Sequence, residues 1–276
     1  MACDIYHNFR ESEEDKRPAV DFMEMVQEDI TRCMRAILMD WLVEVAIEYK
    51  LLPETLFLAV NYIDRYLSVI PIDRERLQLL GVTCMMIDAK YEEISAPHVE
   101  DFCYITDNTY SQNEVLQMEF SVLHYLKFEM TAPTVRCFLM LLLPFAQLDN
   151  LAHHQPKLQF LASYICELTL IEYNMLRYPP SLIASSAIFL ARFLLTQEPW
   201  NLTLMYYTRY QPSDLQECVE ALRVLVFESS ASSLKAISEK YSQDKYKCVA
   251  EITCPASIPL ENFDNIRSGQ IDPTSS

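Results

Sequence analysis

The chain has 276 residues, enough for one large domain or two of ordinary size with a substantial buried core. Only 2 residues are glycine, which disfavours folds built on glycine turns or on close approach of backbone to phosphate, such as Rossmann domains, P-loop enzymes and hairpin-rich β-sandwiches. The formal net charge of −17 would repel a nucleic-acid backbone, so we expect no nucleic-acid partner. An all-helical chain is what remains.

Membrane, secretory and metal-binding classes are also disfavoured. No apolar stretch reaches the roughly 20 residues that span a bilayer. The acidic residues that follow Met1 do not form a secretory signal. The 9 cysteines contain no C-x-x-C pair, which indicates buried thiols in a reducing compartment rather than a disulfide framework or a zinc site. We therefore expect neither a metal ion nor a cofactor, and no contact with a membrane.

Residues 1–30 form an acidic leader, in which we expect one N-terminal helix. After it, apolar residues recur at helical spacing to about Ser242, as in the set Leu116, Glu119, Phe120 and Leu123. Prolines fall between these stretches, and two spacings are typical of capping boxes: Ser111 to Glu114 and Ser213 to Gln216. The sequence predicts about ten helices with short connections.

The chain repeats itself with an offset of 103 residues. The shift superposes three sets of similar residues: Leu58 and Ala59 on Leu161 and Ala162, Asp64 on Glu167, and Leu80 and Gly81 on Ile183 and Ala184. One offset serves two separate helices, although chance matching of amphipathic helices is the competing explanation. We predict two copies of a five-helix unit, at residues 31–130 and 131–250, followed by a flexible tail at 251–276 that is rich in proline.

The sequence carries no recognisable catalytic pattern. It has no H-E-x-x-H, G-x-S-x-G or P-loop motif, and the adjacent His153 and His154 are interpreted as loop residues exposed to solvent. Carboxylates lie mostly on predicted solvent faces, so no general acid and base pair can be selected. We do not expect an enzyme.

Two places do not fit an ordinary helical bundle. The predicted helix at residues 34–47 is apolar on too many sides, so it is either central in its bundle or leaves an apolar patch around Trp41 that suits a peptide groove. Lys90 and Glu119 each lie beside buried surface, where an unpaired charge is costly. They are expected to pair at an edge, either as a structural ion pair or as an anchor for a partner.

These places carry a family resemblance. The chain is similar to the A-type cyclins, with a plant source as one option, and the similarity runs from Asp4 to about Ala250. The strings that carry it are Met34-Arg35-Ala36-Ile37-Leu38, Asp40-Trp41-Leu42-Val43-Glu44-Val45, Asn61-Tyr62-Ile63-Asp64-Arg65-Tyr66-Leu67, Leu77-Gln78-Leu79-Leu80-Gly81, Tyr91-Glu92-Glu93-Ile94 and Tyr104-Ile105-Thr106-Asp107. The resemblance implies tandem five-helix cyclin boxes after a leader helix.

The resemblance also implies a function and its residues. The chain would be a regulatory subunit that binds and activates a cyclin-dependent serine/threonine kinase and recruits Arg-x-Leu substrates and inhibitors in cell-cycle control, in the nucleus. The kinase-binding residues carried over from the family are Lys90, Glu119, Phe128, Met130, Ile5 and Phe9. The substrate-docking groove carried over is Met34, Ile37, Leu38, Trp41, Glu44, Leu77, Gln78, Ile105 and Asp107.

Within that groove, Glu44 and Asp107 would receive the arginine of the peptide, Gln78 its backbone and Trp41 its leucine. One departure from the family concerns the kinase side: Asp88 stands where a small residue is usual, and an unpaired buried carboxylate there would lower stability or kinase affinity. The family's long N-terminal extension with its destruction signal is also missing, so the chain is either a fragment or is turned over in another way.

Two other functions compete with kinase activation. A helical scaffold could bind Arg-x-Leu peptides without activating any kinase, and Asp88 is the main reason to consider it. A cyclin-box protein of the transcription-factor type could touch promoter DNA, but its second repeat would need a basic face that this chain does not show.

Overall fold

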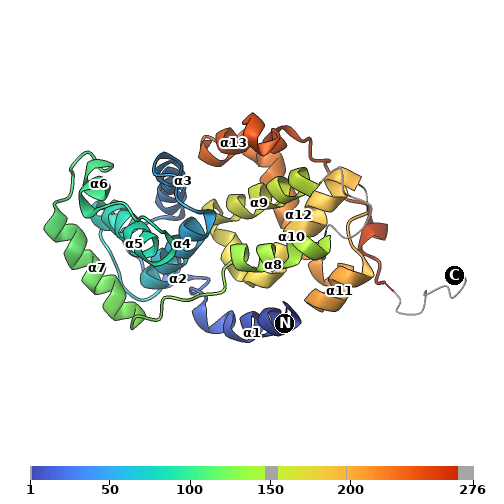
Figure 1. The fold of residues 1–276 in the computed structure, drawn as a ribbon, viewed down its shortest axis with the longest axis horizontal. Coiled ribbons are helices and arrows are strands. Elements are labelled where there is room, and N and C mark those ends of the chain that lie inside the picture. Colours follow the sequence, from blue (N-terminus) through green and yellow to red (C-terminus); the bar gives the residue numbers. More distant parts are fainter. Residues whose placement is uncertain (1, 147–154, 197, 267–276) are drawn as a thin grey trace, which may run out of the picture.

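A computed structural model describes residues 2–146, 155–196 and 198–266. Its ribbon forms two helical bundles side by side (Figure 1), and the described residues contain no strand. The expected all-helical class with tandem five-helix bundles is therefore confirmed.

The first bundle is built around one central helix. It comprises α3 (Arg32–Glu48), α4 (Pro53–Leu67), the short η2 (Arg74–Arg76), α5 (Leu77–Glu92), α6 (Val99–Tyr104) and α7 (Gln112–Leu126). Helix α5 is central because its residues 79–89 are all buried. A methyl group added at Gly81 would lie 2.8 Å from Cδ1 of Leu38, so this glycine lets α3 approach α5 closely.

The second bundle repeats the first at the predicted offset. It comprises α8 (Val135–Ala146), α9 (Gln155–Ile171), η3 (Tyr173–Arg177), α10 (Pro180–Thr196), α11 (Leu202–Thr208) and α12 (Pro212–Ser229). Adding 103 to the bounds of α3 to α7 brings each onto the corresponding helix of this set, although the offset was found from two helices only. The repeat is therefore a property of the whole bundle.

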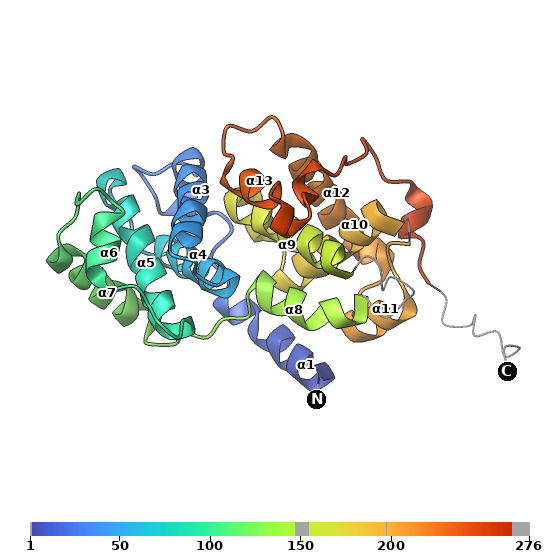
Figure 2. The same ribbon diagram turned by 45° about the horizontal axis from the view of Figure 1, so that its top comes forward.

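The leader crosses both bundles, and its first helix packs on the second bundle. It comprises α1 (Ala2–Ser12), η1 (Glu14–Lys16) and α2 (Phe22–Met25). Tyr6 and Phe9 contact Phe138 of α8 edge to face, with ring centroids 5.5 and 5.9 Å apart. In Figure 2, α1 lies below α8, at the same edge as the connection that leaves α7.

The segment after the second bundle continues as short helices. It contains α13 (Ala236–Tyr241), η4 (Asp244–Tyr246), η5 (Val249–Glu251) and η6 (Leu260–Phe263). Phe263 is buried and stacks on Phe189 of α10 with ring centroids 5.1 Å apart. An aromatic anchor thus places the segment up to residue 266 against the second bundle despite its loop-like composition, and the flexible tail at 251–276 stays a prediction. Residues 267–276 lie outside the described part, as do His153 and His154.

The scarcity of glycine does not mean a scarcity of left-handed backbone. Among the described residues, eight that are not glycine have positive φ: Lys50, Asp107, Asn108, Lys127, Phe128, Arg209, Lys247 and Cys248. Several follow helix ends, where basic side chains are favoured by the helix dipole. Left-handed backbone at helix ends therefore does not depend on glycine here, and the all-helical fold class holds.

The helix starts test the two predicted capping boxes. Ser111 and Glu114 form the expected box at α7, with the Ser111 backbone N–H donating to Glu114 at 2.9 Å. The box at Ser213 is wrong, because α12 begins at Pro212 and its cap pairs Gln211 with Asp214 at 2.7 Å. Proline at the first helical position displaced the start by two residues.

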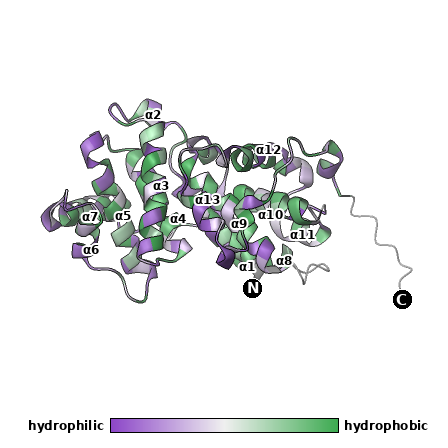
Figure 3. Cartoon of the chain, turned by 90° about the horizontal axis from the view of Figure 1, so that it is seen from above, coloured by the Kyte–Doolittle hydropathy of each residue, from purple (hydrophilic) through white to green (hydrophobic). Residues whose placement is uncertain are grey.

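Apolar side chains line the interior of both bundles. In Figure 3 hydrophobic stretches run along helices on each side of the molecule, and polar stretches mark many of the connections. Among the described helices none has the length and apolar character needed to cross a bilayer. The helices instead bury their apolar faces against one another.

Candidate functional site

The expected pair of Lys90 and Glu119 is formed at the edge of the first bundle. Lys90 lies in the last turn of α5 and Glu119 in the middle of α7, and Nζ donates to Oε1 at 2.6 Å. The Lys90 side chain is 46% exposed and that of Glu119 is 17% exposed. The pair is therefore accessible to a partner from the lysine side, while Glu119 is held in place by its surroundings.

Helix α7 presents apolar side chains to solvent beside this pair. The set whose spacing predicted this helix does not form its buried side, since Leu116 is 44% and Phe120 is 71% exposed. The buried side of α7 consists of Val115, Met118, Val122 and Leu126. Both sides of α7 carry apolar residues, so helical periodicity alone does not tell which side is buried.

The connection after α7 continues this surface. Phe128 is 68% exposed and has a φ of 57°, while Met130 is half-buried and its carbonyl accepts from Tyr62 at 2.7 Å. Glu129 between them pairs with Lys16 of the leader. That ion pair fastens the leader to the connection.

The leader residues assigned to kinase binding differ in exposure. Ile5 is 40% exposed, whereas Phe9 is half-buried because its ring packs on Phe138. Ile5 therefore offers more free apolar surface than Phe9. The structure brings Lys90 and Glu119 together, but Ile5 and Phe9 belong to the side of the second bundle.

The over-apolar helix α3 leaves a hollow at the surface. The hollow has a volume of about 400 Å³ and is lined by Met34, Ile37, Leu38, Trp41, Arg74, Leu77 and Gln78. Ile37 is 54% exposed, whereas Leu38 and Leu77 are buried and form the floor. Helix α5 is the central helix, so the second apolar stripe of α3 faces an open groove.

Three of the expected groove residues lie outside this hollow. Glu44 and Asp107 are exposed, and Ile105 is half-buried after the end of α6. Arg74, which the sequence did not single out, lines the hollow and is bonded to Asp29, whose carboxylate also accepts from the Arg74 backbone at 2.8 Å. Arg74 lies three residues before the groove residue Leu77, and this spacing is the sequence feature that could have indicated it.

Asp88 is buried near the C-terminal end of the central helix α5, as the sequence led us to expect. It has no solvent exposure, and neither carboxylate oxygen has a hydrogen-bond partner among the described residues. Burial, with the nearby carboxylates of Glu92 and Glu93, raises its pKa from 3.8 to about 9. The side chain is therefore protonated at neutral pH in the folded chain.

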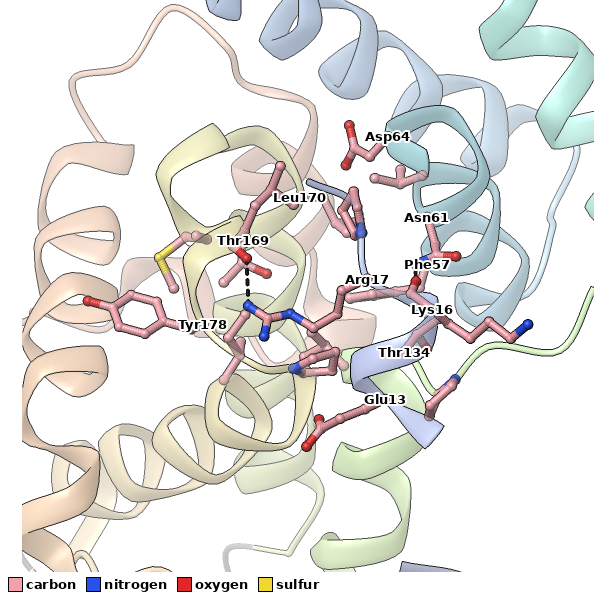
Figure 4. Close-up of a pocket in the computed structure, with 18 of the residues that line it drawn as sticks. Glu13, Lys16, Arg17, Phe57, Asn61, Asp64, Thr134, Thr169, Leu170 and Tyr178 are labelled. Atoms are coloured by element: carbon pink, nitrogen blue, oxygen red, sulfur yellow. Dashed lines mark hydrogen bonds between the residues drawn. The ribbon is translucent and has the colours of Figure 1, made fainter. Parts of the chain in front are cut away.

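A separate cavity of about 80 Å³ lies where the leader meets both bundles (Figure 4). Arg35 of α3 forms a buried ion pair with Asp64 of α4 at 2.6 Å and also donates to the Leu170 carbonyl of α9 at 3.0 Å. Arg17 of the leader donates to the Leu176 carbonyl at 3.0 Å. These bonds fix the two bundles relative to each other, so the cavity belongs to a structural junction.

No group of three or more potential metal ligands is found in the described ranges.

Comparison with known families agrees with this architecture. The family model described as the cyclin N-terminal domain matches residues 4–131, and the model described as the cyclin C-terminal domain matches residues 133–255. The chain belongs to the cyclin family, with one cyclin box in each bundle.

Within that family it is similar to plant A-type members. It is 60% identical over 267 residues to Cyclin-A1-1 of Oryza sativa subsp. japonica, covering 95% of this chain and 52% of the relative. It is 58% identical over 269 residues to Cyclin-A1-1 of Arabidopsis thaliana, covering 96% of this chain and 58% of the relative. The chain thus spans about half the length of these relatives.

Solved structures show the same fold at low sequence identity. A viral cyclin from herpesvirus saimiri superposes with a TM-score of 0.69 at 22% identity, covering 80% of this chain and 96% of that chain. A chain of the yeast RNA polymerase II CTD kinase complex CTDK-1 superposes with a TM-score of 0.60 at 15% identity, covering 87% and 84%.

Proposed function

We propose that this chain is a regulatory subunit that binds a cyclin-dependent serine/threonine kinase and holds it in its active state. The observation that carries the proposal is the accessible pair of Lys90 and Glu119 on α5 and α7, together with the exposed ring of Phe128 in the connection that follows α7. An ion pair next to exposed apolar side chains suits a protein partner, because the apolar area supplies affinity and the charges select orientation. Similarity to A-type cyclins and to a chain of a kinase complex supports the identity of the partner.

Activation would follow from a shift of populations. A kinase is active when its αC helix lies inward and its Lys–Glu ion pair is formed. A surface that binds αC more tightly in that position favours the active state by the difference in affinity. The stiff helical bundle suits this role, since little conformational entropy is lost when it docks.

We further propose that the hollow on α3 recruits substrates and inhibitors bearing Arg-x-Leu. Trp41, Leu38 and Leu77 would receive the leucine. The exposed carboxylates of Glu44 and Asp107 would receive the arginine outside the hollow itself.

Copurification with a cyclin-dependent kinase and a histone kinase assay test the first proposal. Replacing both Lys90 and Glu119 with alanine should abolish copurification and activation, because the orienting charges are lost. A matched control replaces Arg177 and Glu217, an exposed ion pair of the second bundle, and should leave both readouts at the parent level. Full activation by the Lys90 and Glu119 variant would remove the basis of the proposal.

The groove is tested separately with Trp41→Ala. This variant should keep basal histone phosphorylation and lose the preference for substrates that carry Arg-x-Leu. Circular dichroism provides the control for folding. An unfolded variant would mean that Trp41 is a structural residue, and substitution of the exposed Ile37 by Asp would then decide the assignment.

A scaffold that binds Arg-x-Leu peptides without activating a kinase is the second candidate. The buried carboxyl of Asp88, two residues before Lys90 on the same helix, is the observation that favours it. This function would be identified if the parent chain binds the peptide but does not stimulate a kinase, and if the Asp88→Ala variant does stimulate it.

A further inference from the structure

A second cleft lies at the other end of α3, between the two bundles. It has a volume of about 240 Å³ and is formed by the end of α3, the start of α4, and the segment of α13 and η4. We call it the inter-bundle cleft and define it by Ile47, Lys50, Leu52, Lys240, Lys245 and Tyr246.

The inter-bundle cleft is basic in an acidic chain. Three lysines line it and no lining residue carries a carboxylate, although the chain has a net charge of −17. Lys240 is neutralised by both oxygens of the buried Glu167, each 2.8 Å away. Lys50 and Lys245 form no ion pair with any described residue, and both are exposed. Two uncompensated positive charges therefore border this cleft.

Local structure explains how these two lysines reach the same place. Lys50 follows the end of α3 in the left-handed region, with a φ of 55°, where a cation is favoured by the helix dipole. Lys245 lies in η4, some two hundred residues later, and its Nζ is 5.0 Å from the ring centre of Tyr246. The stacking orders Lys245 without neutralising its charge.

The cleft also offers apolar surface. Ile47 is 38% and Leu52 is 45% exposed, and the half-buried ring of Tyr246 lies beside them among the lining residues. Exposed aliphatic side chains bordered by lysines match a ligand that is both apolar and negatively charged. A polyanion alone would leave the apolar part uncovered.

We propose that the inter-bundle cleft is a docking site for an acidic peptide segment of a protein partner, in which carboxylates flank one large apolar side chain. The apolar side chain occupies the surface of Ile47 and Leu52, and the carboxylates face Lys50 and Lys245. Its charge preference is opposite to that proposed for the groove at the start of α3, so one helix serves two classes of partner segment.

The probe is a fluorescent 12-residue peptide with glutamates around one leucine and one phenylalanine, titrated with the full 276-residue chain and followed by anisotropy. We expect saturable binding that weakens with salt. Replacing both Lys50 and Lys245 with glutamate should lower the affinity at least about tenfold, since two attractive pairs become repulsive. Each single substitution should give a smaller loss.

The matched control is Lys127→Glu, because Lys127 is also exposed, has a φ of 52° and follows a helix end. It should bind the acidic peptide like the parent, and the double variant should still bind an Arg-x-Leu peptide. Circular dichroism separates lost binding from lost folding.

Four results would overturn the proposal. Equal binding of a lysine-substituted peptide would exclude charge recognition. Undiminished binding after serine replaces the leucine and phenylalanine would exclude the apolar contact, as would tighter binding of an oligonucleotide. Binding that ignores the Lys50 and Lys245 substitutions would place the peptide elsewhere. None of these readouts needs a kinase, so they are independent of the proposed kinase activation.

Discussion

The two bundles bury a carboxylate at the same repeat position and satisfy it in different ways. Asp64 of α4 receives two hydrogen bonds from Arg35, a residue of its own bundle. Glu167 of α9 receives Lys240 and Tyr241 from α13, a helix added after the second bundle. Both bundles therefore bury a carboxylate at this repeat position, but its cationic partner comes from α3 in the first bundle and from α13 in the second.

The central helices differ at the end that faces the proposed kinase surface. Asp88 and Lys90 of α5 correspond to Ala191 and Phe193 of α10, and both of the latter are buried. At these two positions the second bundle therefore has apolar core residues, whereas the first bundle has ionisable ones. Helix α10 also buries a charge, Arg192, but its guanidinium donates to the carbonyls of Ala146 and Glu198. The carboxyl of Asp88 has no such partner among the described residues, so the stability cost falls on α5.

The largest expected effect distinguishes the two buried anions. Asp64→Ala leaves Arg35 unpaired at 1% side-chain exposure, which should cost about 3–5 kcal/mol. Glu167→Ala leaves Lys240, which is 10% exposed and can reach water by a small movement, so about 2 kcal/mol is expected. Thermal unfolding followed by circular dichroism measures both. A larger loss from Glu167→Ala would reverse the comparison.

The next effect is the pH dependence that Asp88 gives to the first bundle. Its pKa is raised from 3.8 to about 9 in the folded chain, so its contribution to stability is full below pH 4 and is lost as the pH rises toward 9. Near neutral pH this loss approaches about 1.4 kcal/mol per pH unit. Asp88→Asn removes the titrating group and should flatten that dependence.

Denaturant unfolding of the parent and of Asp88→Asn between pH 5 and 9 measures this difference. The titratable groups whose charges interact with Asp88 are Tyr62 on α4, Cys84 and Glu92 on α5 and Glu93 just after α5, and all are common to both proteins. The corresponding substitution Ala191→Asp in α10 is the matched test, and it should introduce the same slope. Parallel pH curves for parent and Asp88→Asn would show that the carboxyl is solvated.

The smallest effect concerns the close contact at Gly81, whose counterpart in α10 is Ala184. Gly81→Ala gains about 1 kcal/mol of helix propensity but forces the end of the Leu38 side chain to move. Leu38 forms part of the groove floor, so we expect a net stability change below about 1 kcal/mol and a few-fold weaker binding of an Arg-x-Leu peptide. Isothermal titration calorimetry measures the peptide affinity, and an unchanged affinity would show that Leu38 does not form part of the peptide site.

Much of the architecture was predictable from the sequence. The scarcity of glycine, the helical periodicity and the offset of 103 residues constrain the bundle, because each repeated helix must fit the same neighbours. The pairing of Lys90 with Glu119 followed from charges beside apolar stretches, whereas the burial of Asp88 was expected from the family resemblance. The family resemblance supplied the roles of these residues, which periodicity cannot provide.

Other features depend on tertiary structure that periodicity does not encode. The buried side of α7 does not follow from the pattern because the exposed Phe120 is as apolar as the buried Met118. Arg74 reaches the groove through its bond to Asp29 in the leader. The inter-bundle cleft joins Lys50 to Lys245, and no local pattern links residues so far apart in the chain.

Arg35 has a consequence for the geometry of a bound kinase. Its guanidinium holds Asp64 of the first bundle and the Leu170 carbonyl of the second, while α1 of the leader rests on the second bundle and the Lys90 edge belongs to the first. The affinity of a kinase that contacts both bundles would depend on the angle between them. Replacing Arg35 would remove bonds that fix this angle, so it would weaken the proposed kinase complex without changing any residue in contact with the kinase.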